Sequence, residues 1–260
     1  MKQVKAPIVS TVVVMPETYL VGLEAPKIAA SARPGQFIMV RCGGGTTLPR
    51  PFSVHRVDGG KVSLLFRVVG RGTRWLAARR KGETLDIFGP LGNGFTLPDT
   101  AQSILLAAGG IGIAPLVFLA DEAVKQGKEI VLFMGAQNLT CILPHELLPA
   151  GVKTVLTTED GSAGFQGIIT AAWADMHLQY PAFQNIQDIF ACGPYPMYQS
   201  MKELPHFTGK NVQVSLEVVM GCGAGVCYGC TIRTKQGLKQ VCRDGPVFNL
   251  EDVIWEGPES

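Results

Sequence analysis

The sequence reads Met220-Gly221-Cys222-Gly223-Ala224-Gly225-Val226-Cys227-Tyr228-Gly229-Cys230 near its carboxyl end, and Cys242 follows. The spacing is C-x4-C-x2-C, then eleven residues, then C. Four thiolates at this plant-type spacing hold a [2Fe–2S] cluster. The interspersed glycines let the loop turn tightly, so that main-chain N–H groups can approach the sulfurs. The stretch predicts a [2Fe–2S] cluster bound by Cys222, Cys227, Cys230 and Cys242.

A zinc knuckle or a disulfide pair is the alternative for these cysteines. Zinc sites usually repeat C-x2-C twice, whereas only Cys227 and Cys230 form such a pair here. The chain has seven cysteines, an odd number, and four of them share the cluster spacing rather than a disulfide framework. Both facts favour a reducing cytoplasm.

The composition indicates a globular chain with abundant turns. It has 260 residues, 47% of them hydrophobic, 31 glycines and a formal charge of +2, which makes nucleic acid an improbable partner. The basic start precedes only a short apolar run, so no signal peptide is expected. The longest apolar stretch, from Ile104 to Ala120, is shorter than the ~20 residues of a membrane span.

Residues 1–98 alternate short apolar runs with turns, which predicts a small antiparallel β-barrel. The expected strands are Val12–Met15, Phe37–Arg41, Phe52–Val57, Val62–Arg67 and Leu85–Phe88. A short helix is expected from Thr73 to Arg79, with Thr73 as its N-cap.

Two places in this barrel have the chemistry of a phosphate site. Arg50-Pro51-Phe52-Ser53 enters a strand after a glycine-rich loop, and Gly70-Arg71-Gly72-Thr73 opens into the short helix. Free N–H groups at a helix start and a nearby guanidinium suit a pyrophosphate. A surface arginine and a plain turn with its cap are the alternatives; together, ahead of a nucleotide fold, the two segments favour a flavin site.

Residues 99–212 alternate strands with helices, which predicts a parallel α/β nucleotide-binding domain. The expected strands are Ser103–Ala108, Glu129–Met134, Val152–Thr157, Asp188–Ala191 and Val212–Leu216. Helices are expected at Pro115–Lys125, with proline first, and near Gly167–Met176 and Pro194–Leu204.

Several segments resemble the ferredoxin–NADP reductase superfamily. Arg50-Pro51-Phe52-Ser53 is similar to its R-P-x-S flavin signature, Arg33-Pro34-Gly35-Gln36-Phe37 to its R/K-P-G-Q-F segment, and Gly89 to Phe95 to the link between its domains. The resemblance implies bound FAD, held by a set of residues in the first domain. These are Arg50, Pro51, Phe52, Ser53, Leu65, Phe66, Arg67, Gly72 and Thr73.

The nucleotide domain carries two further resemblances. The turn at Gly109, Gly110, Gly112 and Pro115 matches the superfamily's G-G-x-G-x-x-P, although tight strand-to-helix packing also explains such glycines. Cys192-Gly193-Pro194 is similar to the start of its C-G-P-x-x-M, which implies contact with the nicotinamide; a buried apolar thiol is the alternative for Cys192. Residues 135–139 contain no Arg or Lys, which favours NAD over NADP.

The tail Val241-Cys242-Arg243-Asp244-Gly245-Pro246-Val247-Phe248 resembles the electron-transfer subunits of class 1B dihydroorotate dehydrogenase. The resemblance implies a [2Fe–2S] module over residues 213–260. It also implies that electrons pass from an FMN-containing catalytic subunit through [2Fe–2S] and FAD to NAD+ in pyrimidine biosynthesis, in an assembly with two of each subunit. No proton-transfer residue is expected, and His55, His145, His177 and His206 are isolated in the sequence.

Two other functions remain open from the sequence. A sister subunit of a sulfide dehydrogenase or transhydrogenase complex would share this architecture, and co-purification with an FMN-bearing partner would separate the two. A non-enzymatic metal-binding or redox-sensing protein on a reductase scaffold is the other, and it would lack flavin.

Overall fold

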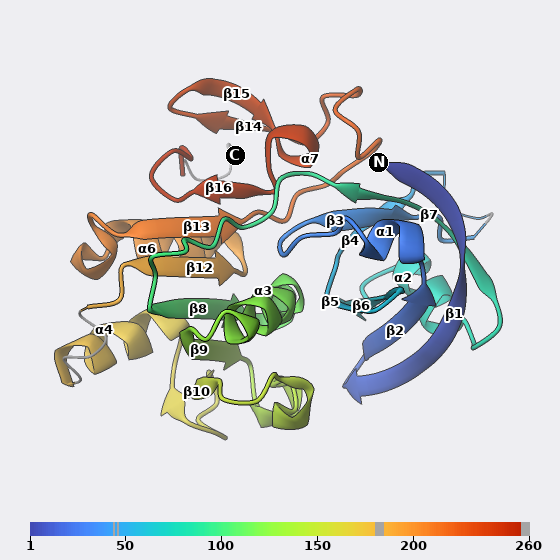
Figure 1. The fold of residues 1–260 in the computed structure, drawn as a ribbon. Coiled ribbons are helices and arrows are strands. Elements are labelled where there is room, and N and C mark those ends of the chain that lie inside the picture. The colour runs from blue at the N-terminus through green and yellow to red at the C-terminus, as the bar shows by residue number, and fades with distance from the viewer. Residues whose placement is uncertain (44, 46, 180–184, 256–260) are drawn as a thin grey trace.

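The computed structural model describes residues 1–43, 45, 47–179 and 185–255. An antiparallel barrel lies on the right of Figure 1, a parallel sheet on the left, and a small module at the top. Among these described residues no helix is long and apolar enough to cross a membrane.

The barrel is one curled sheet of seven antiparallel strands in the order β4-β3-β7-β1-β2-β6-β5. Its strands are β1 (Lys2–Met15), β2 (Thr18–Glu24), β3 (Phe37–Val40), β4 (Arg50–Ser53), β5 (Arg56–Asp58), β6 (Lys61–Arg67) and β7 (Thr84–Leu91), with α1 (Pro26–Ala29) beside them. The predicted antiparallel fold is therefore observed.

Two details of the barrel correct the sequence analysis. The predicted strand Phe52–Val57 is two strands, β4 and β5, and β2 was missed altogether. The turn that joins β1 to β2 explains the second error: Glu17 takes a φ of 53° there without a glycine, so the usual signal of a hairpin is absent.

The short helix of the barrel also begins earlier than predicted. α2 spans Arg71–Ala77 and its N-cap is Gly70, so Thr73 is the third helical residue and not the cap. The Thr73 hydroxyl reaches back and accepts the N–H groups of Val69 and Gly70, at 2.9 and 3.1 Å. It stabilises the helix start from inside the first turn.

The second domain is a sheet in the order β11-β10-β9-β8-β12-β13-β16. Its parallel strands are β8 (Ser103–Gly109), β9 (Glu129–Ala136), β10 (Lys153–Thr158), β11 (Phe165–Gln166), β12 (Asp188–Cys192) and β13 (Asn211–Ser215). The helical segments are η1 (Gly110–Gly112), α3 (Ile113–Lys125), η2 (Leu139–Cys141), η3 (His145–Leu147), α4 (Ile169–Gln179), α6 (Tyr195–Glu203) and η4 (Pro205–Phe207).

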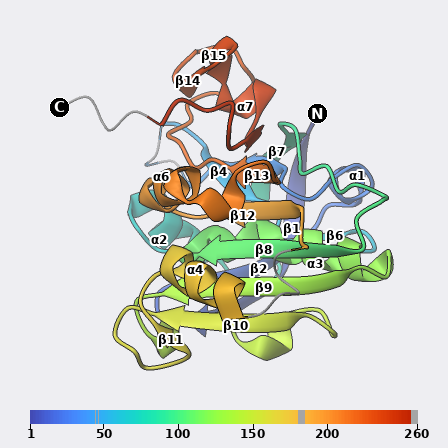
Figure 2. The same ribbon diagram turned by 90° about the vertical axis from the view of Figure 1, so that its left-hand side faces the viewer.

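Helices cover both faces of this sheet, because the buried side chains of each strand alternate between them. Leu105 and Ala107 of β8 share a core with α4 and α6, whereas Ile104 and Leu106 share one with α3. Figure 2 shows α4 and α6 on the near face of the sheet. Pro115 was expected to open α3 but is its third residue. Its missing N–H costs no helical bond in this first turn.

The carboxyl-terminal module leaves the sheet after β13 and returns to it. It contains a hairpin of β14 (Thr231–Thr234) and β15 (Gly237–Gln240), the short α7 (Val241–Asp244) and β16 (Val247–Asn249). β16 pairs antiparallel with β13 and completes the nucleotide sheet. The hairpin fills the interval between Cys230 and Cys242, so the fourth cysteine folds back over the other three.

Candidate functional site

The four cysteines of the carboxyl-terminal module gather at one loop beside the barrel. Cys230 and Cys242 are buried, Cys222 is half-buried and Cys227 is exposed. The loop lies against β3 and β7, because a Cβ on Gly223 would come within 2.5 Å of Met39 and 3.4 Å of Leu91. The cysteine loop thus touches the barrel directly.

Main-chain N–H groups point at three of the four sulfurs. The Cys222 sulfur accepts from Ala224 and Val226, each at 3.4 Å, and the Cys242 sulfur accepts from Gly225 at 3.1 Å. The N–H of Cys242 in turn donates to the Cys230 sulfur at 3.4 Å. Such donors stabilise thiolates and tune a cluster's potential. Gly223 and Gly225 make this possible with φ values of 70° and 75°.

The thiols meet as two pairs, Cys222 with Cys227 and Cys230 with Cys242, each within hydrogen-bonding reach. Burial raises the pKa of Cys222, but the N–H groups around it outweigh burial and lower that pKa to about 6. Burial and the neighbouring Cys230 raise the pKa of Cys242 to about 12. Four thiolates this close need positive charge between them, and two sulfurs for each of two irons suit a [2Fe–2S] cluster. In the described part of the chain, no group of three or more His, Cys, Asp or Glu side chains is arranged to bind a single metal ion.

The segment that links the barrel to the nucleotide sheet fixes this module in place. The side-chain amide of Asn93 donates to the carbonyls of Arg243 and Asp244 at the end of α7, at 3.2 and 3.1 Å. Its main-chain N–H donates to the carbonyl of Gly245 at 2.6 Å. Asn93 therefore holds the turn that carries Cys242.

The structure brings the two predicted flavin segments of the barrel together. The side chain of Arg50 lies along the first turn of α2, since a Cβ on Gly72 would sit only 3.4 Å from its Cγ atom. Arg50 also donates to the carbonyl of Leu48 at 2.9 Å. A guanidinium beside N–H groups that have no helical acceptor fits a pyrophosphate.

Other members of the predicted flavin set bury their side chains in hydrophobic cores instead, Phe52 and Phe66 in that of the barrel and Leu65 in the one that it shares with α3. The side chains of Phe52, Leu65 and Phe66 are buried, and Phe52 packs edge-on against Phe66 with ring centroids 5.3 Å apart. Only their main-chain groups can face a flavin. Pro51 and Ser53 are half-buried on β4.

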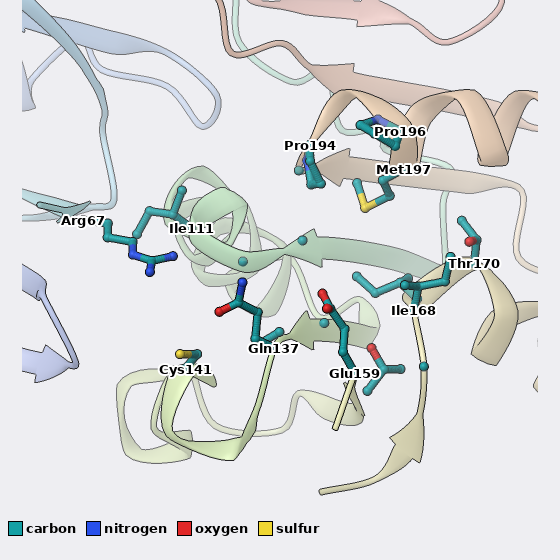
Figure 3. A pocket seen from close by; sticks show the side chains of 18 of the residues that line it. Arg67, Ile111, Gln137, Cys141, Glu159, Ile168, Thr170, Pro194, Pro196 and Met197 are labelled. Atoms are coloured by element: carbon teal, nitrogen blue, oxygen red, sulfur yellow. The ribbon is translucent and has the colours of Figure 1, made fainter. Parts of the chain in front are cut away.

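A cavity of about 480 Å³ opens where the carboxyl ends of the parallel strands meet the barrel. Open α/β sheets bind ligands at this edge. Of the predicted cofactor residues it contains Arg67, Gly109, Gly110, Gly193 and Pro194. Figure 3 shows Arg67 reaching in from the barrel, with Pro194 and Met197 on the wall formed by α6. The described cavity does not include Arg50 to Ser53, Gly72 or Thr73.

The predicted glycines allow backbone to pack on backbone beneath this cavity. A Cβ on Gly112 would come within 2.1 Å of the Cys192 carbonyl oxygen, and one on Gly109 within 2.7 Å of Pro194. Gly110 differs, because it takes a φ of 55° with open space around its missing side chain. The turns after β8 and β12 are thereby locked together, and Gly110 faces the cavity.

Three polar residues of the cavity have no assignment from the sequence. The Thr157 hydroxyl is fully buried and has no hydrogen-bond partner among the residues that the structure describes. Glu159 points inward beside Gln137, and Glu217 follows the end of β13. Burial raises the pKa of Glu217. All three follow or end parallel strands, which was the available signal. An orphaned hydroxyl at the wall fits a ligand that has hydroxyl groups.

Cys192 lies behind the cavity wall rather than on it. Its side chain is 1% exposed, and burial followed by the charge of Glu217 raises its pKa. The nearby Tyr198 hydroxyl accepts the N–H of Gly193 at 2.8 Å and donates to the carbonyl of Ser215 at 2.7 Å. This bridge ties the turn after β12 to the end of β13.

Two protein-family profiles match the chain. The iron-sulfur cluster binding domain of dihydroorotate dehydrogenase B matches residues 217–254, and the oxidoreductase NAD-binding domain matches residues 106–203. Two similar curated proteins are each named dihydroorotate dehydrogenase B (NAD(+)), electron transfer subunit. The one from Desulforamulus reducens is 36% identical and covers 96% of this chain and 98% of its own length. The one from Caldanaerobacter subterraneus is 36% identical over 85% of this chain and 87% of its own.

Solved structures agree on the fold. A chain of an NADH-dependent reduced ferredoxin–NADP oxidoreductase is 28% identical, with a TM-score of 0.86 over 97% of this chain and 90% of that one. A ferredoxin–NADP+ reductase from Neisseria gonorrhoeae with bound FAD and NADP is 16% identical, with a TM-score of 0.65 over 77% of this chain and 89% of that one. The second similarity concerns the fold alone.

Proposed function

The chain belongs to the family of electron transfer subunits of dihydroorotate dehydrogenase B (NAD(+)), and from this premise we propose that it connects NAD to a catalytic subunit through FAD and a [2Fe–2S] cluster. One observation carries the proposal. The cysteine loop packs on the barrel at Met39 and Leu91 and continues directly from β13, after which Glu217 lines the nucleotide cavity. The cluster loop thus touches both other domains.

We assign the three cofactors to three regions. Residues 1–98 bind FAD, residues 99–212 bind NAD, and residues 213–260 carry the cluster. When bound, the cluster exchanges single electrons and the flavin converts them into the electron pairs that NAD+ accepts as hydride. The cluster ligands are Cys222, Cys227, Cys230 and Cys242. The FAD residues are Arg50, Pro51, Phe52, Ser53, Leu65, Phe66, Arg67, Gly72 and Thr73. The NAD residues are Gly109, Gly110, Gly193 and Pro194 at the cavity, and Gly112 and Cys192, which support its wall from behind.

The chain's own residues bind and orient rather than transfer protons. Arg50 and the first turn of α2 neutralise the flavin pyrophosphate. Gly110 lets the nucleotide backbone approach closely, and the Thr157 hydroxyl bonds a ribose hydroxyl. The N–H groups of the cysteine loop stabilise negative charge on the sulfurs.

NAD rather than NADP is the proposed substrate. Glu159 lines the cavity on the side away from Arg67 (Figure 3), and a carboxylate accepts ribose hydroxyls but repels a 2′-phosphate. This agrees with the absence of Arg and Lys from residues 135–139.

The catalytic subunit is proposed to dock over the cysteine loop. Val219, Val226 and Tyr228 are 87%, 75% and 68% exposed, and they lie on the same loop as the exposed Cys227. Large apolar side chains so exposed together indicate a protein interface. The partner that we propose is an FMN-containing dihydroorotate dehydrogenase subunit, in an assembly with two of each chain, and the name electron transfer subunit of the curated relatives supports such a partner. None of the seven cysteines, all of them in the described part of the chain, forms a disulfide, and we propose a cytoplasmic location on this ground.

Anaerobic purification of the chain with its native partners tests this function. We expect one FAD and one [2Fe–2S] cluster per chain, bleaching of the flavin on addition of NADH, and FMN in the protein that accompanies it. Zinc without acid-labile sulfide would contradict the cluster.

A transhydrogenase-type subunit is the second candidate, because the chain superposes with a TM-score of 0.86 on a chain of an NADH-dependent reduced ferredoxin–NADP oxidoreductase. A co-purifying partner that lacks FMN and does not oxidise dihydroorotate would favour this candidate.

A further inference from the structure

The helix α3 lies between the nucleotide sheet and the barrel. Figure 1 shows it on the barrel side of the sheet, and it packs on β5 and β6. Ala114, Phe118 and Asp121 are spaced four and three residues apart, so they share one face of the helix. Phe118 is buried in the core of the barrel, although the rest of α3 packs on its own sheet. This face is therefore the contact between the two domains.

His55 from the barrel makes the first polar anchor to this face. Its Nδ1 atom lies 3.0 Å from the carbonyl oxygen of Ala114, and the side chain is 1% exposed. A carbonyl can only accept, so Nδ1 carries the proton and donates it. Burial lowers the pKa of His55 to about 4, which keeps the ring neutral. A buried bond of this kind is costly to break, because the freed N–H and C=O groups have no water to bond in its place.

Arg56, the next residue, makes the second anchor. Its Nε atom donates to one oxygen of Asp121 at 2.6 Å and its Nη2 atom to the other at 3.0 Å. The Nη2 atom also donates to the carbonyl of Leu147 at 3.2 Å. A bidentate pair fixes orientation as well as distance. Both side chains are mostly shielded from solvent.

The two anchors are seven residues apart on α3, or about 10 Å along a helix with a rise of ~1.5 Å per residue. Two contacts on one rigid helix fix its direction relative to the barrel. Phe118, which lies between them in the barrel core, fixes the distance of the helix from the barrel. On the barrel side, His55 is two residues beyond Ser53 of the proposed flavin segment. On the sheet side, Ala114 is two residues beyond Gly112 of the nucleotide turn. The first anchor thus joins the chain just after the proposed flavin segment to the chain just after the nucleotide turn, and the second anchor holds the same helix seven residues further on.

We propose that His55, Arg56 and Asp121 are positioning residues that set the nicotinamide against the flavin by holding α3 to the barrel. This rests on the proposed function, since it requires that NADH reduces the bound flavin. None of the three is among the residues proposed to bind FAD or NAD, and they act through the helix. Misplacement of reacting atoms by about 1 Å can cost on the order of 100-fold in rate. The anchors therefore affect the reaction rate more than nucleotide affinity.

The test uses the holoprotein with FAD and cluster bound, and rapid mixing with NADH. We expect Arg56→Ala and Asp121→Ala each to slow the limiting rate of flavin reduction by about 10- to 100-fold, with the apparent Kd for NADH changed less than about threefold. The double variant is expected to be no slower than either single one, because both remove the same pair. His55→Asn is expected to retain more of the rate than His55→Ala, since an amide nitrogen can replace Nδ1. Additive losses, or unchanged rates, would overturn the proposal.

Glu122→Gln is the matched control, because Glu122 neighbours Asp121 but pairs with Lys125 of the same helix at 2.7 Å. It should leave the rate unchanged; an equal loss there would contradict a role specific to the domain contact. Arg56→Lys, which keeps the charge, replaces Arg56→Ala if the latter does not fold, and a rate equal to that of the wild type would then sink the proposal.

A readout without NADH separates this proposal from the proposed function. Hydrogen exchange of α3 and β5 amides should rise in Asp121→Ala but not in Glu122→Gln, and unchanged exchange refutes the anchor. If NADH does not reduce the flavin of the wild type, the proposed function fails. Hydrogen exchange then decides by itself whether the anchors hold α3 to the barrel.

Discussion

The cysteine loop and the nucleotide cavity are built in opposite ways. Three of the four cluster thiols lie within nine residues, and main-chain N–H groups of the same loop donate to the sulfurs of Cys222 and Cys242. The cavity takes its walls from residues as far apart as Met15 and Glu217, on two domains. A local loop depends on its own turns, whereas an assembled cavity depends on how the domains sit together. Damage should therefore stay confined in the first region and spread in the second.

Cys230→Ser gives the largest expected effect and tests how confined the cluster loop is. Loss of a buried thiolate ligand should abolish the cluster and all electron transfer to the partner. NADH should still reduce the flavin, because the cavity does not include this loop. Iron and sulfide analysis with rapid-mixing spectroscopy measures both. Loss of flavin reduction as well would show that the two regions are not independent.

Arg50→Ala tests the contact of Arg50 with α2, which joins two segments of a single domain and so is less local than the cysteine loop but more local than the cavity. Removal of the guanidinium beside α2 takes away charge-assisted bonds worth ~1.5–3 kcal/mol, so FAD should bind about 10- to 100-fold more weakly. Flavin retained after gel filtration measures this, and the cluster content serves as the internal reference. Unaltered flavin affinity would remove Arg50 from the site.

A pH series tests how much the contact of His55 with α3 contributes to stability. Burial lowers the pKa of His55 from 6.5 to about 4, so the unfolded chain binds the proton first. Its contribution to stability is complete above pH 6.5 and is lost as pH falls toward 4; by pH 5 the loss is about 2 kcal/mol at ~1.4 kcal/mol per pH unit. Urea unfolding of the wild type against His55→Asn at pH 7 and pH 5 measures the difference. Parallel curves would exclude His55 as the titrating group.

Glu159→Gln gives the smallest expected effect and tests whether this carboxylate makes the cavity prefer NADH to NADPH. Without the carboxylate, the ratio of NADPH to NADH reduction rates should rise about tenfold, in line with one unfavourable charge contact of about 1.4 kcal/mol. Asp160→Asn is the control, because its carboxylate accepts the N–H of Ser162 within its own loop. A similar rise in that control would point to general charge rather than to position 159.

The same contrast explains what the sequence predicted. The cluster ligands and the turns after β8 and β12 were predicted from spacing and motif, because each is formed largely by a few consecutive residues. Thr157, Glu159 and Glu217 belong to no motif, and only the parallel strand order brings them to one cavity. The fold class was predictable from periodicity, and it agrees with the observed sheets.

The errors in secondary structure have local causes. β2 was missed since Glu17 forms its turn without glycine, and the cap of α2 was misplaced because Thr73 bonds backwards from the third position. The contact of His55 and Arg56 with α3 had no signal at all, since each partner is an ordinary residue far away in the chain. Contacts between domains depend on shape, and no short pattern encodes them.

The return of the chain as β16 has a consequence for protein engineering. Since β16 covers the edge of β13, a truncation after Ser215 would strip a row of backbone N–H and C=O groups of their partners. Bare strand edges recruit other chains and promote aggregation. A cluster-free version is therefore better made by replacing ligands than by cutting the chain.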